Sequence, residues 1–118
     1  MTTEIQSVIQ AYFQGYLSAD SEQIARAFHP QARLYATEDT KLEKTELAEW
    51  LDSLRQRRAK GDIRQGKLEI ASMDVAGTAA AVKTILTFPT FEFTDYLSLL
   101  QIEGQWRIIG KIYAVRST

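Results

Sequence analysis

Apolar side chains recur with helical spacing through residues 3–18, the first patterned segment of the chain. They are Ile5, Val8, Ile9, Tyr12, Phe13, Tyr16 and Leu17. This spacing gives a helix one broad apolar face. Thr3 followed by Gln6 fits a capping box at the helix start. The pattern therefore predicts an amphipathic helix over residues 3–18.

Two shorter helical segments follow. Asp20 can cap the first of them, and His29-Pro30 ends it. The sequence ARLYAT that comes next favours a short strand. Thr45 can cap the other helix, and Gly61 closes the polar tail behind it. The apolar stripe of this last helix comprises Leu47, Trp50, Leu51 and Leu54.

The pattern changes to strands from Lys67 onward. Four β-like runs span 67–76, 78–88, 91–103 and 105–116. The breaks between them are Gly77, Pro89-Thr90 and Glu103-Gly104. Long strands with such short connections indicate an antiparallel meander. The order of elements predicts one α+β domain over 1–118, with three N-terminal helices packed on a curved, mostly antiparallel β-sheet.

The last two predicted strands are apolar on both faces. Helices can cover only one face of a sheet, so the other face needs a different cover. In a chain this short, a second copy of the chain is the simplest cover. We therefore expect a homodimer through the sheet face that carries Tyr96, Leu100, Ile108 and Ile112.

Composition narrows the classes of function. The 118 residues are 45% hydrophobic and 25% charged, with a formal net charge of -1, which is ordinary for a globular domain. The chain has no long basic run that would indicate a nucleic-acid partner. No segment approaches the roughly 20 apolar residues of a membrane span. The chain has no cysteine and one histidine, which excludes thiol catalysis and a multi-histidine metal site. We expect a cytoplasmic protein without a metal or an organic cofactor, and without a nucleic-acid or membrane partner.

One carboxylate stands inside an otherwise apolar strand. Asp95 lies in FTDYLSLL, residues 93–100, and a buried carboxylate needs a partner or a ligand. A regular turn at Glu103-Gly104 would pair the last two strands so that the numbers of two paired residues add up to about 207. Asp95 should then lie opposite Lys111 or Ile112. An ion pair with Lys111 explains both charges, although Lys83 competes as a partner. Alternatively, Asp95 or Lys111 binds a polar group of a ligand.

This layout resembles the NTF2-like superfamily of cone-shaped α+β domains, which includes ketosteroid isomerase and the polyketide cyclases related to SnoaL. The resemblance covers the whole chain and rests on IQAYFQGYLSAD, IARAFHPQARL and the ending DYLSLLQIEGQWRIIGKIYAV. The ending is most similar to a bacterial branch labelled putative lumazine-binding. Fold-level resemblance of this kind does not transfer an activity.

The isomerase members of the superfamily imply specific roles for a few residues. YFQGYLSAD matches their helix-one tyrosine, which places that role on Tyr12, and Asp95 falls near their late-strand aspartate. Their carboxylate base on the first strand corresponds here to Ala36, so the base is missing. Glu38 lies two residues later and should face the same side. Ketosteroid-type isomerisation is therefore not expected.

From these observations we expect the cone to bind a small apolar or aromatic molecule. The predicted lining residues are Tyr12, Tyr16, Trp50, Phe93, Asp95, Leu97, Lys111 and Tyr113. One alternative is a cofactor-independent isomerase, dehydratase or cyclase, with Asp95 as acid or base and Tyr12 as hydrogen-bond donor. Another is a dimeric adaptor with a vestigial pocket.

Overall fold

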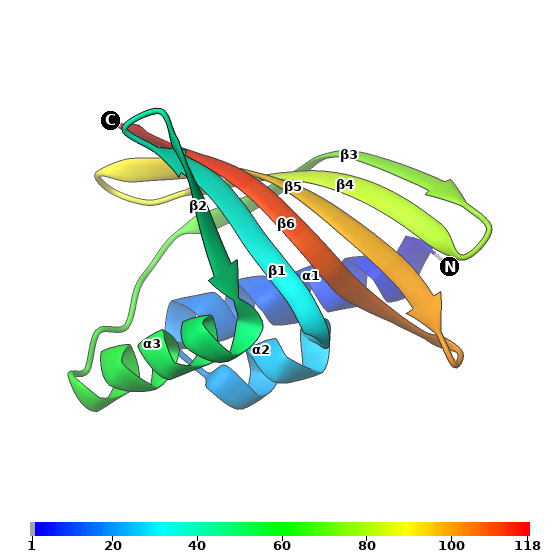
Figure 1. Cartoon of the computed structure of the whole chain (residues 1–118), viewed down its shortest axis with the longest axis horizontal. Coiled ribbons are helices and arrows are strands. Elements are labelled where there is room, and N and C mark those ends of the chain that lie inside the picture. The colour runs from blue at the N-terminus through cyan, green and yellow to red at the C-terminus, as the bar shows by residue number, and fades with distance from the viewer. Residues whose placement is uncertain (1) are drawn as a thin grey trace.

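The three helices lie on one face of a strongly curved sheet (Figure 1). A computed structural model describes residues 2–118. Helix α1 spans Thr2–Ser18, α2 spans Ser21–Ala27 and α3 spans Leu47–Ala59. None of the helices described within these residues is long and apolar enough to cross a membrane.

Six strands form a single sheet in the order β2-β1-β6-β5-β4-β3. Their bounds are β1 Phe28–Glu38, β2 Lys41–Glu46, β3 Lys67–Ala76, β4 Ala79–Thr87, β5 Phe91–Ile102 and β6 Gln105–Ser117. Strand β1 pairs with β6 in parallel, and every other neighbouring pair is antiparallel. The predicted α+β cone, with its mostly antiparallel sheet, is confirmed.

Of the three predicted helix caps, only Asp20 is correct, because α1 begins at Thr2 and so already includes Thr3. Asp20 caps α2 as predicted, because its side chain accepts hydrogen bonds from the backbone N–H groups of Glu22 and Gln23 at 3.1 and 3.2 Å. Thr45 does not cap α3. The cap is Glu46, which forms a capping box with Glu49. Thr45 belongs to β2 instead, because the pairing of β1 with β2 continues through Arg33 and Glu46.

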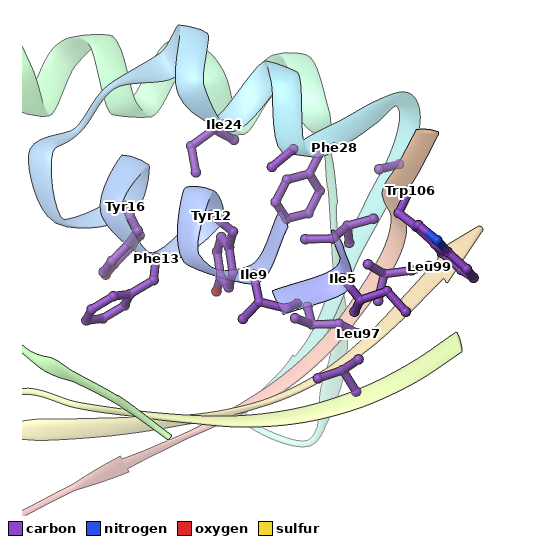
Figure 2. Packing of buried hydrophobic residues seen from close by; sticks show 14 of the residues in the cluster. Ile5, Ile9, Tyr12, Phe13, Tyr16, Ile24, Phe28, Leu97, Leu99 and Trp106 are labelled. Carbon is purple, nitrogen blue, oxygen red and sulfur yellow. The ribbon is translucent and has the colours of Figure 1, made fainter. Parts of the chain in front are cut away.

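The core lies between α1 and the concave face of the sheet. Figure 2 shows the α1 side chains that project toward the strands: Ile5, Ile9, Tyr12, Phe13 and Tyr16. They pack with buried side chains of β4, β5 and β6: Val82, Leu86, Leu97, Leu99, Trp106 and Ile108. The regular spacing on α1 and the period-two alternation on the strands therefore bury the two faces against each other.

A β-bulge in the β5–β6 pair changes which side chains face the helices. Leu99 pairs with Ile108 but Ser98 pairs with Gly110, so β6 carries one extra residue at this point. As a result Ile108 is fully buried, and its predicted place on the exposed sheet face is wrong. Ile112, Tyr96 and Leu100 do lie on that face, with 60%, 52% and 36% of their surfaces exposed.

Candidate functional site

Three polar side chains from three elements meet inside the core. The Tyr12 hydroxyl on α1 donates a hydrogen bond to Asp95 Oδ2 on β5 at 2.5 Å. Lys111 Nζ on β6 donates to the same hydroxyl oxygen at 2.8 Å. Tyr12 and Asp95 are fully buried, and Lys111 is 6% exposed. The three residues form one hydrogen-bonded chain, called here the polar triad.

The sequence predicted a direct contact between Asp95 and Lys111, and the structure corrects it. The Tyr12 hydroxyl lies between the two charges, and Asp95 and Lys111 are not among the ion pairs of residues 2–118. The extra residue at the bulge places Asp95 opposite Tyr113 and places Lys111 opposite Leu97. A regular turn cannot reveal this shift, because the bulge lies well beyond it.

Only one of the two carboxylate oxygens of Asp95 has a hydrogen-bond partner within residues 2–118. Within residues 2–118, its Oδ1 atom and the Oγ1 atom of Thr84 are buried without a hydrogen-bond partner. The two residues are paired across β4 and β5. Burial, followed by the charge of Asp95, raises the pKa of the Tyr12 hydroxyl well above its ordinary value, so this group stays protonated. Tyr12 therefore remains a donor to Asp95 over the accessible pH range.

Lys111 lies in an aromatic cage. Its Nζ atom is 4.9 Å from the centre of the Tyr12 ring, 4.8 Å from that of Trp50 and 4.9 Å from that of Tyr113. Burial lowers the pKa of the Lys111 amine, and the charge of Asp95 partly opposes this shift. The amine is therefore easier to deprotonate than a lysine in water, although the ring faces favour its cationic form.

A cavity of about 440 Å³ opens next to the triad, at the end of the sheet where β1 and β6 finish and β2 begins. It is lined by Ala36, Thr37, Glu38, Glu43, Thr45, Tyr113, Ala114 and Val115. We call it the mouth cavity. Tyr113 belongs both to the cage around Lys111 and to the wall of this cavity. The cavity and the aromatic cage around Lys111 therefore share one side chain, Tyr113.

Two carboxyl groups stand on the wall of the mouth cavity. A hydrogen bond with Glu38, and repulsion from its charge, raise the pKa of the Glu43 carboxyl above its ordinary value. Burial and the charges of Asp95, Glu43 and Glu38 raise the pKa of the Tyr113 hydroxyl. Glu38 lines the cavity together with Ala36, as the alternation of β1 predicts. Glu43 was not predicted as a site residue, because the polar sequence KLEKTE gives little indication of a strand.

Most of the predicted lining residues lie inside the core and not on the cavity wall. Leu97 is 1% exposed and faces the core opposite Lys111. Phe93 packs against Tyr113 and Tyr16, with ring centres 6.0 and 5.8 Å apart. Phe93 thus connects the mouth cavity with the end of α1.

Tyr16 is held by a separate group of charges at the end of α1. Its hydroxyl accepts a hydrogen bond from Arg64, and the Arg57 guanidinium lies 4.9 Å from the centre of its ring. Asp62 pairs with both arginines, at 3.4 Å from Arg57 and 3.3 Å from Arg64. Neither arginine was predicted. Arg57 lies in the last turn of α3 and Arg64 lies in the connection between α3 and β3, and only the fold brings both to Tyr16.

The family model described as "Putative lumazine-binding" matches residues 1–114. The chain therefore belongs to this family, within the NTF2-like proteins. Groups of three or more acidic, histidine or cysteine side chains that could hold a metal ion do not occur within residues 2–118.

Solved structures with the same fold come from several bacteria. An NTF2-like protein of unknown function from Shewanella baltica is 28% identical, with a TM-score of 0.85, and the match covers 99% of this chain and 94% of that one. A second one, from Silicibacter pomeroyi, is 20% identical with a TM-score of 0.86, over 98% and 95% of the two chains.

One curated relative carries a name for an activity. The aldolase FrzH of a Cladobotryum species is 27% identical over 104 residues, which are 86% of this chain and 81% of that protein.

Proposed function

We propose that the protein binds a small planar organic molecule in the mouth cavity. The observation that carries this proposal is the cavity itself, whose volume of about 440 Å³ lies within the range of small-molecule sites. Its wall combines the Tyr113 ring with the carboxyl groups of Glu38 and Glu43. Such a wall suits a flat ring system that carries N–H donors. The family's description supports a ligand of the pteridine type.

Lumazine, a fluorescent pteridine, is the probe that tests this function. We expect saturable binding in fluorescence polarisation, with a Kd of about 10 μM or tighter. Ala36→Trp should abolish binding, because the indole fills the space between Tyr113 and Glu43. Ala76→Trp, at the opposite end of the sheet on β3, is the matched control and should bind normally. Equal affinity of both variants would refute the proposed site, and no binding by the natural protein would refute the proposed pteridine ligand.

An acid–base enzyme is the second candidate function. The aldolase name of the fungal relative and the polar triad favour it. In this alternative, Asp95 and Tyr12 supply acid–base chemistry without a cofactor. Ketosteroid-type isomerisation remains unexpected, because Ala36 supplies no base at that position.

A folded protein that accepts neither pteridines nor carbonyl compounds would instead support an adaptor with a vestigial pocket.

We also propose that the exposed sheet face is covered by a second copy of the chain. Ile112 on β6 lies between Tyr96 on β5 and Tyr35 on β1, in one row across the sheet. Leu42 and Leu100 extend this apolar surface, and both are exposed. Large exposed apolar side chains on one sheet face are typical of an interface. A two-fold dimer would bury the same patch on both copies.

Ile112→Lys should therefore convert the dimer to a monomer in analytical ultracentrifugation. The introduced ammonium would be buried without a partner in the proposed interface. Ile63→Lys is the matched control, since Ile63 is 57% exposed but lies outside the sheet. A dimer that survives Ile112→Lys, or a monomeric natural protein, would show that this face is not the interface.

A further inference from the structure

We infer that Lys111 is a nucleophile that forms an imine with an aldehyde or ketone held in the mouth cavity. This inference rests on the cavity of the proposed function and adds a substrate class, carbonyl compounds, and a covalent step. Three conditions must be met: the amine must be near the cavity, it must be available without a proton, and its cationic product must be stabilised.

Lys111 lies one inward-facing position deeper in the core than Tyr113, which is on the cavity wall. Lys111 and Tyr113 are successive inward-facing side chains of β6, and Tyr113 lines the cavity. Across the sheet, Lys111 pairs with Leu34, and Leu34 pairs with Thr45, which also lines the cavity. The small side chain of Ala36 occupies the next row outward, opposite Glu43. A carbonyl group at the inner end of a bound ligand would therefore come close to Nζ.

The surroundings of Lys111 favour a reactive amine over a structural ion pair. A buried structural lysine normally contacts its carboxylate directly, whereas here the Tyr12 hydroxyl separates Lys111 from Asp95. Burial shifts the amine toward its neutral form. A neutral amine still donates one N–H to Tyr12 and keeps its lone pair for the carbonyl carbon. The cage of Tyr12, Trp50 and Tyr113 rings suits the positive charge of the product.

The step balances without any further reactant. The Lys111 ammonium first gives one proton to the pair formed by Tyr12 and Asp95. The lone pair of Nζ then forms a bond to the carbonyl carbon, and one N–H proton moves from Nζ to the carbonyl oxygen. The first proton returns to this hydroxyl, which leaves as water, and a C=N bond replaces the C=O bond. The protonated imine keeps one positive charge in the cage, so the charge of the site equals that of the lysine ammonium. Tyr12, which is hydrogen-bonded to both Nζ and Asp95, is placed to relay the proton.

Acetylacetone is the first probe, because a 1,3-diketone forms a stable, ultraviolet-absorbing enaminone with a reactive lysine. Benzaldehyde followed by borohydride is the second, because reduction fixes the adduct for peptide mass analysis. We expect labelling at Lys111 to be about tenfold faster than at any other lysine of the chain. Lys111→Met should remove this fast phase. Lys83→Met, which removes the half-buried lysine over the Tyr96 ring, is the matched control and should keep it.

The pH dependence gives an independent readout. The rate of labelling should rise with pH and level off at a lower pH than for Nα-acetyl-lysine in solution, because burial lowers the pKa of Lys111. The titratable groups that face Lys111 are Tyr12 on α1, Asp95 on β5 and Tyr113 on β6. Glu38 on β1 and Glu43 on β2 stand farther out on the cavity wall.

Protection experiments keep the test valid even if Lys111→Met does not fold. Saturating lumazine should slow the labelling of Lys111 in the natural protein and leave other lysines unaffected. Labelling of Lys111 no faster than that of surface lysines would overturn the inference. If lumazine binds while Lys111 stays unlabelled, the inference fails and the proposed binding function stands. If Lys111 is labelled and lumazine does not bind, the inference stands and the proposed pteridine ligand fails.

Discussion

Replacing Tyr12 with phenylalanine is expected to destabilise the folded protein by about 3 kcal/mol or more, measured by urea unfolding. The Tyr12 hydroxyl is the donor to Asp95 Oδ2 and the acceptor for Lys111 Nζ. Without it, a fully buried carboxylate loses its described side-chain donor, since Oδ1 has no partner within residues 2–118. The ring itself is retained, so packing against Phe28 and Trp50 should persist.

Tyr113→Phe is the matched control for this substitution. It removes the same atom from a side chain that is only half-buried and lies at the mouth cavity. Its effect should stay within about 0.5 kcal/mol, because water can solvate this part of the site. If Tyr12→Phe cost no more than Tyr113→Phe, the Tyr12 hydroxyl would not be the group that satisfies the buried charges.

The sequence predicted which polar residues meet in the core more accurately than it predicted the geometry of their contacts. Asp95 stood out as a charge within an apolar strand, and alternation along the last strand placed Lys111 and Tyr113 on one side. The structure brings these three residues together. The link through Tyr12 could not be derived from periodicity, because helical spacing shows only that Tyr12 faces the core and not which strand its hydroxyl reaches.

The errors arise from features without a local signal. One extra residue at the bulge near Gly110 reverses the alternation, so that Ile108 and Ile112 face opposite sides of the sheet. Nothing in RIIGKI marks this reversal except the glycine. The placement of Glu43 depends on the hairpin of β1 and β2, whose turn at Asp39 and Thr40 has positive φ angles at both residues. Neither residue is glycine, so the turn is difficult to recognise in the sequence.

The energetic coupling between Asp95 and Lys111 should depend on Tyr12. In the natural background, Asp95→Asn and Lys111→Met should each cost about 3 kcal/mol, because each leaves a buried polar partner uncompensated. The double variant should cost less than the sum by about 1–2 kcal/mol, since neither charge then remains alone.

The same cycle in the Tyr12→Phe background separates a bridged contact from a direct one. If the hydroxyl carries the interaction, the coupling measured by urea unfolding should fall by about half or more, and only the attraction between the charges would remain. A coupling unchanged by Tyr12→Phe would mean that Lys111 and Asp95 interact without the bridge. Strict additivity in the natural background would mean that the two charges do not interact at all, and that the aromatic cage alone accommodates the Lys111 ammonium.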